Sequence, residues 1–245
     1  MNHGVRLSLV ALILALGMIL SAAVVSKLFV RVRHEQAITV KGYAEQDVVS
    51  DIGKFTCACS VRGVSLQEAH AKLQASRDRV LAYLQQKQFP VADIAAQTIQ
   101  IAKVVKRDAQ GKETNEIEYY DLSQWIAVTS SNVAAIRDVS ITISDLIKEG
   151  IDLSVTPPEF YVSTLPATKL ALLAKATCDA YRRAVVLAEN SQGRVGALIS
   201  AQQGVLQITE RHSTDTSGCG VYDTATIEKT AKAVVTLEYA IEPVR

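Results

Sequence analysis

Along the chain of 245 residues, apolar side chains follow two kinds of spacing from Ala37 onward. Alternation of apolar and polar residues predicts half-buried strands, whereas apolar residues three and four positions apart predict helices. The stretches with strand spacing are 37–51, 52–63, 92–107, 117–131, 151–164, 194–211 and 226–243. The stretches with helical spacing are 65–88, 132–150 and 165–193. The mixture predicts an α+β fold.

The predicted helices carry boundary signals of their own. Ser65 followed by Glu68 is a capping box, in which each residue satisfies a free backbone N–H at the start of a helix. Gly150 ends the second helical pattern, and Gly193 follows the third as a stop signal. Pro166 lies in the first turn of the third helix, where its missing N–H removes no hydrogen bond. These signals predict three separate helices.

The order of the predicted elements limits the topology. The stretches 37–51 and 52–63 meet at a polar break, and we expect them to form a hairpin. From the second stretch onward the order is strand, helix, strand, strand, helix, strand, which is the ferredoxin-like sequence of elements. A long helix and two C-terminal strands follow this core. Pro157 and Pro158 should confine the last core strand to a sheet edge or a bulge, because proline donates no hydrogen bond.

The N-terminus differs from the rest of the chain. No charged residue interrupts the apolar run Leu7–Ser26. About 20 apolar residues are enough for a helix to cross a bilayer. A cleaved signal peptide is the alternative, because Arg6 precedes the run and small residues lie near its end, but a signal core is usually shorter. We therefore expect a membrane anchor with a basic juxtamembrane stretch at 1–34, followed by a single domain at 37–243.

Composition narrows the choice of partners. Hydrophobic residues make up 49% of the chain and its formal net charge is +1. Such a chain can form a substantial core. A nucleic-acid-binding protein would carry a clustered basic face, whereas the Lys and Arg residues here are interspersed with acids. We expect no nucleic-acid partner.

The loop RHSTDTSGCGVYD, Arg211–Asp223, has the composition most typical of a chemical site. His212 could act as the base for a Cys219 nucleophile, and with Asp215 and Asp223 these residues could also bind a metal ion. However, the cysteine lies in a Gly-flanked, Ser- and Thr-rich stretch, and the chain has no ligand pair at the short spacing of zinc sites. The sequence favours a connection between two strands, with a thiol-dependent enzyme using Cys219 and His212 as the minor alternative.

The remaining chemistry-bearing residues suggest no site. Cys57 and Cys59 share one face of a predicted strand at a spacing too long for an unstrained mutual disulfide. Cys178 lies in the long helix, and a bridge involving Cys219 is as plausible as four free thiols. No Gly-rich phosphate loop opens a helix. We therefore expect no enzyme activity, no catalytic residue, no cofactor and no metal.

Three phrases in the chain resemble a known family. They are ITVKGYAEQDVVSD near the start of the body, SQGRVGALISAQQGVLQI after the long helix, and IEKTAKAVVTLEYAIE at the end. Together with the order of elements they resemble the SIMPL-domain family, a bacterial envelope domain of unknown function, over about residues 37–243. The N-terminal apolar segment is similar to that of a membrane-anchored branch of the family.

This resemblance implies a location and a kind of activity. Family members are exported to the periplasm or cell surface, some form ring-like homo-oligomers, and they are linked to envelope and oxidative stress. The eukaryotic member that gives the family its name is an adaptor for a signalling kinase. No catalytic residue set is established for the family, so none is transferred to this chain.

The basic flank of the apolar run conflicts with the implied export. Lys27, Arg31 and Arg33 follow the run, and the positive-inside rule would keep the body in the cytoplasm. We follow the resemblance and expect a single-pass inner-membrane protein with its body in the periplasm. The expected function is that of a homo-oligomeric scaffold or accessory protein. The alternative is an accessory subunit of a larger complex with other envelope proteins.

Overall fold

A computed structural model describes residues 17–18, 21–22, 37–215 and 217–243 of the chain. The chain divides into two compact units. Each unit contains part of β1, part of α4 and part of β10. Unit 1 takes its described residues from 1–44, 171–205 and 233–245, and unit 2 from 45–170 and 206–232. The strands are β1 (Ala37–Val49), β2 (Ile52–Gly63), β3 (Ile94–Ala96), β4 (Gln100–Arg107), β5 (Glu113–Ser130), β6 (Asp152–Val155), β7 (Glu159–Tyr161), β8 (Gly193–Gln203), β9 (Gln207–Glu210) and β10 (Glu228–Pro243). The helices are α2 (Leu66–Gln86), α3 (Val133–Thr142) and α4 (Leu165–Asn190), with 3₁₀ turns η1 (Val91–Asp93) and η2 (Ile143–Glu149).

Unit 2 contains a six-stranded antiparallel sheet around β2. On one side β2 pairs with β5 from Gly53 opposite Ser130 to Gly63 opposite Tyr120. On its other side it pairs with β6 and β7, and β5 in turn pairs with β3 and β4. The prediction of a strand–helix–strand–strand–helix–strand order from residue 52 onward agrees with these elements, to which the structure adds two short strands.

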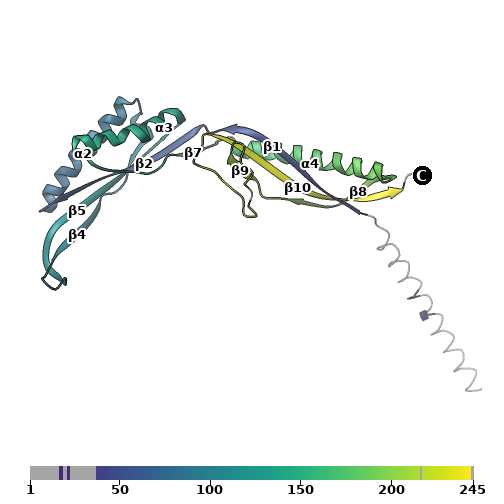
Figure 1. The fold of residues 1–245 in the computed structure, drawn as a ribbon, viewed down its shortest axis with the longest axis horizontal. Helices are drawn as coiled ribbons and strands as arrows, with labels where there is room; N and C mark the ends of the chain where they lie inside the picture. Colours follow the sequence, from purple (N-terminus) through teal and green to yellow (C-terminus); the bar gives the residue numbers. More distant parts are fainter. Residues whose placement is uncertain (1–16, 19–20, 23–36, 216, 244–245) are drawn as a thin grey trace, which may run out of the picture. The chain divides into compact units, whose positions relative to one another are not determined.

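Two helices pack on one face of this sheet (Figure 1). The face of β2 that meets them was predicted by alternation, and Phe55, Cys57 and Cys59 are all at most 1% exposed. Leu73 and Ile136 extend the same core from α2 and α3. Burial of such side chains stabilises the unit by about 1.5–3 kcal/mol each.

The helix boundaries follow the sequence signals. The Ser65 hydroxyl accepts a hydrogen bond from the Glu68 N–H at 3.2 Å, and the Glu68 carboxylate accepts from the Val64 N–H at 3.1 Å. The second predicted helix consists of α3 and then the 3₁₀ turn η2. It ends at Gly150, whose φ of 85° is a left-handed conformation that glycine adopts without strain.

The proline pair interrupts an edge, as predicted. Pro157 and Pro158 lie between β6 and β7, which follow one another along the same side of β2. Thr156 closes the gap, because its N–H donates to the Thr56 carbonyl at 2.9 Å and its hydroxyl accepts from the Thr56 N–H at 3.2 Å. The prolines therefore lie where the ladder is already broken.

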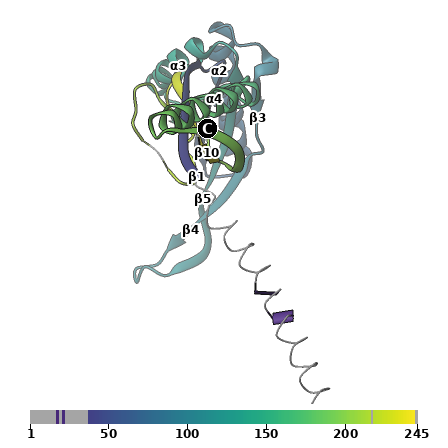
Figure 2. The same ribbon diagram turned by 90° about the vertical axis from the view of Figure 1, so that its right-hand side faces the viewer.

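In unit 1 the strands β1, β10 and β8 lie side by side in that order, and α4 runs along this sheet (Figures 1 and 2). Strand β8 pairs antiparallel with β10, from Gln203 opposite Val235 to Gly193 opposite Pro243. Tyr181 of α4 makes an edge contact with Tyr239 of β10, with ring centroids 5.8 Å apart. The predicted strand 194–211 is two strands, because β8 ends before Gly204 and β9 begins at Gln207.

Helical spacing predicts one apolar stripe on α4, and the structure confirms it in part. The predicted residues are Leu170, Leu173, Ala174, Ala180, Ala184, Leu187 and Ala188, of which Ala180, Ala184 and Ala188 are fully buried. The larger residues Leu170 and Leu187 are 72% and 48% exposed. The fully buried positions recur at every fourth residue and are Leu172, Ala176, Ala180, Ala184 and Ala188. The alanines allow a close approach to Gly42 of β1, where an added Cβ would lie 2.0 Å from the Ala176 carbonyl oxygen.

The predicted hairpin between 37–51 and 52–63 is wrong. Strand β1 pairs with β10, and β2 belongs to the other sheet. The polar break at Ser50 and Asp51 is therefore a crossing between sheets. The Ser50 N–H donates to the Ile227 carbonyl at 2.9 Å and the Asp51 N–H to the Tyr161 carbonyl at 3.0 Å, so both amides have acceptors from distant segments.

The predicted anchor lies almost wholly outside the described residues. Within the part of the chain that the structure describes, no helix is long and apolar enough to cross a membrane. The anchor therefore stays a prediction. The single domain at 37–243 also stays a prediction, with two compact units inside that range.

Candidate functional site

The loop between β9 and β10 contains both residues of the predicted thiol site. His212 and Cys219 are exposed. The Cys219 N–H donates to the Ser217 hydroxyl at 3.3 Å, and His212 has a left-handed φ of 66°. Within the described residues no hydrogen bond joins the imidazole to the thiol. The geometry therefore gives Cys219 no base in contact with it.

The four residues considered as metal ligands are not gathered together. Among the residues that the structure describes, no three His, Cys, Asp or Glu side chains lie close enough to hold one metal ion. The Asp215 N–H donates to the Ser213 hydroxyl at 3.0 Å, as in a local turn. The Asp223 carboxylate instead forms an ion pair with Lys229 at 3.5 Å.

Gln207 in β9 fixes the far part of the loop. Its side-chain nitrogen donates to the Ser217 carbonyl at 2.8 Å, and its side-chain oxygen accepts from the Val221 N–H at 2.7 Å. Ile208 exchanges backbone bonds with the returning chain, accepting from the Asp223 N–H and donating to the Val221 carbonyl, both at 2.8 Å. The loop therefore returns along β9 as a short parallel bridge between Ile208 and Tyr222.

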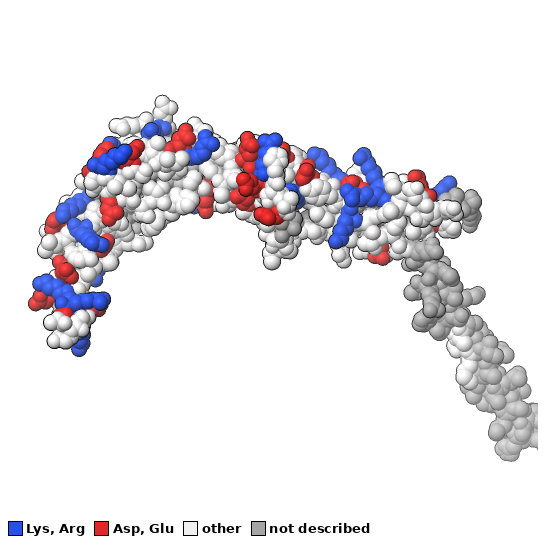
Figure 3. All heavy atoms as spheres, viewed as in Figure 1, with Lys and Arg blue, Asp and Glu red and all other residues white. Residues whose placement is uncertain are grey.

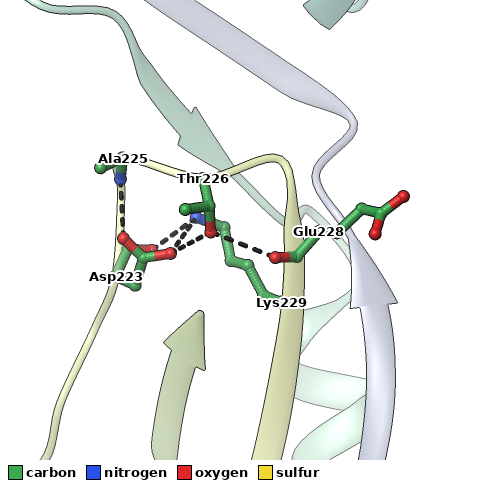
Figure 4. A network of polar contacts seen from close by, with 5 residues as sticks. All are labelled: Asp223, Ala225, Thr226, Glu228 and Lys229. Atoms are coloured by element: carbon green, nitrogen blue, oxygen red, sulfur yellow. Dashed lines mark hydrogen bonds and ion pairs between the residues drawn. The ribbon is translucent and has the colours of Figure 1, made fainter. Parts of the chain in front are cut away.

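Lys229 in β10 is the centre of a polar cluster under the loop (Figure 4). Its side chain is 0% exposed, and its ammonium donates to the Asp223 carbonyl at 2.6 Å and lies 3.5 Å from the Asp223 carboxylate. The same carboxylate accepts from the Thr226 hydroxyl and from the Ala225 N–H. Glu228 takes part through its backbone carbonyl, and its side chain points away from the cluster.

The pKa values of the pair show that its charges balance one another. Burial lowers the pKa of Lys229 below its ordinary value, and the Asp223 carboxylate offsets part of this effect. Burial acts to raise the pKa of Asp223, but hydrogen bonds from Thr226 and Ala225 and the charge of Lys229 outweigh it, so this pKa is lowered. The aspartate is therefore ionised at neutral pH, and its charge compensates the buried lysine.

Further contacts fix the base of the loop. Arg211 pairs with Glu228 at 3.0 Å and with Asp47 of β1 at 3.2 Å. The Lys232 ammonium donates to the Ser213 carbonyl from a nearly buried position in β10. Sequence reasoning missed these lysines as loop anchors. The available signal was the unusual presence of two lysines within the apolar run that forms β10.

All four cysteines are free. Cys57 and Cys59 are fully buried on the helix-facing side of β2. Burial raises the pKa of Cys57 to about 12, with an added contribution from Cys59, and burial raises the pKa of Cys59 to about 11. Both thiols are protonated at neutral pH and unreactive, because only the thiolate is a strong nucleophile. Cys178 and Cys219 are exposed, so no thiol lies in a preorganised reactive pocket among the described residues.

Strand β8 is one edge of the unit 1 sheet. Its side chains are exposed for most of its length, including the neighbours Leu198 at 52% and Ile199 at 46%. No charged residue occurs between Val195 and Thr209. Native edges are usually protected by charged residues, prolines or bulges that discourage further pairing. The outer edge of β8 contains neither a charge nor a proline in this stretch, although its ladder with β10 shifts register on both sides of Leu198.

Strand β1 is the other edge of this sheet, and a side chain of α4 caps one of its backbone N–H groups. Asp179 of α4 reaches the strand, and its carboxylate accepts from the Tyr43 N–H at 2.9 Å. The Arg183 guanidinium donates to the same carboxylate oxygen at 2.8 Å. The hydrogen bond from Tyr43, together with the charge of Arg183, lowers the pKa of Asp179. A side chain thus occupies one backbone donor of the edge.

A groove lies beside β1, next to this capped position. It has a volume of about 550 Å³. Three strand residues and four helix residues line it: Thr39, Val40, Lys41, Arg182, Arg183, Val186 and Leu187. The lining combines aliphatic side chains with three cations and contains no acid.

The chain belongs to the SIMPL family, described as a protein of unknown function (DUF541), whose model matches residues 38–239. The match covers both compact units and the loop between β9 and β10. The family description names no reaction, ligand or partner. No curated protein matches the chain.

Proposed function

We propose that the protein is a single-pass, membrane-anchored envelope protein whose periplasmic body acts as a homo-oligomeric scaffold or accessory protein rather than as an enzyme. The observation that carries this proposal is the edge of β8, which contains no charge and no proline from Val195 onward. Its unpaired backbone groups and uncharged side chains can extend the sheet into a second copy.

The symmetric arrangement is antiparallel pairing of β8 with β8 of a second copy. A two-fold axis brings identical surfaces together and closes the pair. With the axis near Leu198, at the middle of β8, antiparallel pairing would join backbone groups of the two edges on either side of the register shifts that flank Leu198. Removing the remaining exposed area of Leu198 and Ile199 from water adds about 1 kcal/mol per side chain.

Membrane attachment supports weak pairing of this kind. An anchor in the apolar run Leu7–Ser26 confines copies to one surface and raises their effective concentration. The absence of a base beside Cys219 and the protonated thiols of β2 favour a role in assembly over thiol chemistry. Links to envelope or oxidative stress rest on the family resemblance alone.

The test is the oligomeric state of the detergent-extracted full chain, measured by light scattering on size-exclusion chromatography. Leu198→Lys places two like charges opposite each other across the two-fold axis, and we expect it to weaken association at least tenfold. Ile147→Lys is the matched control, since Ile147 is 53% exposed on η2 in unit 2. A monomeric wild type, or equal dissociation in both variants, would count against assembly through β8.

Orientation requires a separate measurement. Cys219 is exposed and Cys178 is the other exposed thiol, so a Cys178→Ser variant reports Cys219 alone. We expect a membrane-impermeant maleimide to label this variant in cells whose outer membrane alone has been permeabilised. Labelling only after complete lysis would place the body in the cytoplasm, as the basic residues after the apolar run suggest.

A further inference from the structure

The groove between β1 and α4 in unit 1 lies along a strand edge. The Tyr43 N–H donates to Asp179 of α4, which shows that this N–H points away from the sheet interior. Backbone direction alternates with a period of two residues in a strand, so the N–H and carbonyl groups of Lys41 and Thr39 point to the same side. The groove therefore presents backbone donors and acceptors as well as side chains.

The charge of the groove is strongly one-sided. Lys41, Arg182 and Arg183 line it, and Figure 3 shows Lys and Arg side chains gathered over the surface formed by α4 and β1. In the described residues Arg183 pairs with Asp179, whereas no carboxylate lies within ion-pair distance of Lys41 or Arg182. Lys41 and Arg182 can therefore face an incoming anion, and Arg182 also interacts electrostatically with the Asp179 carboxylate.

The walls of the groove also suit an apolar side chain. Val186 and Leu187 on α4 are 57% and 48% exposed, although they lie on a helix that packs against a sheet. These side chains line the groove together with the cations of the helix and the residues of β1. An occupant that alternates apolar and acidic residues would contact both kinds of lining.

Asp179 shows how a carboxylate is held at this edge. Its oxygen accepts from a strand N–H and from the Arg183 guanidinium together. The next outward N–H, that of Lys41, lies about 6.6 Å further along the strand, at about 3.3 Å per residue. A second carboxylate at that step would meet the same combination of a backbone donor and the cations of Lys41 and Arg182.

We propose that this groove binds an extended acidic peptide segment of a partner protein, which adds to β1 as an edge strand. Main-chain hydrogen bonds to β1 would provide affinity, and contacts of alternate side chains with the cations and aliphatic walls would provide specificity. Lys41 discourages pairing with basic strands and favours acidic ones. This binding site is independent of β8 and goes beyond the proposed self-assembly.

A peptide fits the groove better than a lipid headgroup. An anionic headgroup would use the cations but leave the row of backbone groups on β1 without partners. An extended peptide uses both, because its own backbone is complementary to a strand edge.

The test uses the full chain in a non-ionic detergent and a short fluorescein-labelled peptide that alternates Val with Glu. We expect saturable binding by fluorescence anisotropy, no binding of the Val–Lys counterpart, and an affinity about tenfold lower for Lys41→Glu and Arg182→Glu. Lys169→Glu is the control, since Lys169 is exposed on α4 outside the groove. Circular dichroism confirms that each variant is folded.

Asp179→Ala provides a second test of the proposed binding site, because a purely structural role of Asp179 would not predict tighter peptide binding in this variant. The change removes the intramolecular carboxylate from the Tyr43 N–H and from Arg183, and so lengthens the available edge. We expect the folded variant to bind the acidic peptide several-fold more tightly. The proposal is overturned if the acidic and basic peptides bind equally, if Arg182→Glu has no effect, or if soluble short-chain phosphatidylglycerol binds saturably and the peptide does not.

Discussion

The ion pair of Lys229 and Asp223 allows the stability cost of an uncompensated buried charge in unit 2 to be measured. Asp223→Ala removes the carboxylate and leaves the lysine ammonium with the backbone carbonyl of residue 223 as an acceptor. Removal of one partner of a buried ion pair typically costs about 3–5 kcal/mol, because the other charge stays buried without compensation. Since the backbone bond is retained and Asp223 is 15% exposed, we expect the lower end, about 3 kcal/mol of unfolding free energy.

The opposite change should cost less. Lys229→Met keeps a side chain of similar length and removes the buried charge. Asp223 then retains its hydrogen bonds from Thr226 and Ala225, and its carboxylate keeps some access to water. We expect a loss of about 1 kcal/mol, the typical net contribution of a hydrogen bond. The prediction is thus an order of effects, with Asp223→Ala more damaging than Lys229→Met.

Urea unfolding of the full chain in detergent at neutral pH measures both changes. Trp125, the only tryptophan, lies in β5 of unit 2, so its fluorescence reports this unit even if the two units unfold separately. Unchanged slopes with urea concentration would show that the variants differ in stability alone. If Lys229→Met destabilised unit 2 as much as Asp223→Ala, the uncompensated charge would not be the dominant cost, and this reasoning would be refuted.

The same pair predicts a response to acid. The folded pKa of Asp223 lies below the ordinary value of 3.8, so ionisation of this group stabilises the folded state above pH 3.8. That contribution is lost as the pH falls through the lowered folded pKa. The difference in stability between wild type and Asp223→Asn should therefore shrink in this acid range. A difference independent of pH would contradict the assignment.

Three further experiments test the packing, the helix cap and the thiols. Gly42→Ala should destabilise unit 1 in chemical unfolding by at least about 1–3 kcal/mol, because the added Cβ would collide with the Ala176 carbonyl oxygen. Gly218→Ala is the control, since its added Cβ meets open space, and it should change stability by less than about 0.5 kcal/mol. Ser65→Ala removes the cap of α2 and should cost about 1 kcal/mol, measured by the same Trp fluorescence. In the folded chain at pH 8, a maleimide should label the two exposed cysteines readily and the two buried cysteines of β2 only on unfolding, as counted by intact mass.

Local features of the fold were predictable because their signals lie within a few residues. The capping box at Ser65, the left-handed stop at Gly150 and the proline interruption between β6 and β7 each depend on backbone chemistry at one place. Alternation also identified the buried face of β2, since one side chain in two must point to the core. These features can be predicted without knowing which distant strand or helix packs against each element.

Pairing of distant strands was not predictable in the same way. Strand β1 has a suitable pattern for a hairpin with β2, yet it pairs with β10, almost the whole length of the body away. Pairing of β1 with β2 and pairing of β1 with β10 bury similar side chains of β1. The pattern of apolar and polar residues therefore does not distinguish between the two arrangements. The same reason explains the helix face of α4. Close contact at Gly42 selects alanines for burial, although a hydrophobic pattern alone assigns the larger Leu170 and Leu187 to the core.

The loop with His212 and Cys219 shows where composition misleads. Ser, Thr, Asp and Gly are frequent both in turns and in catalytic loops, so their presence does not separate the two. The structure separates them through Gln207 and Lys229, whose side chains bind loop carbonyls from the neighbouring strands. Both residues lie in strand patterns, where a polar residue is normally assigned to the solvent face.

The two edges of the unit 1 sheet differ in a way that makes the proposed interactions separable. The β8 edge carries no charge from Val195 onward, so the proposed contact there is symmetric and uncharged and should be insensitive to salt. The β1 edge carries Lys41 and faces Arg182, so the proposed peptide contact should weaken as salt rises. Pairing of two copies through β8 leaves both β1 edges open. Leu198→Lys should therefore reduce association without loss of peptide binding, and Lys41→Glu should do the reverse. If one change abolished both activities, a single surface would be responsible, and the assignment of a separate interaction to each edge would fail.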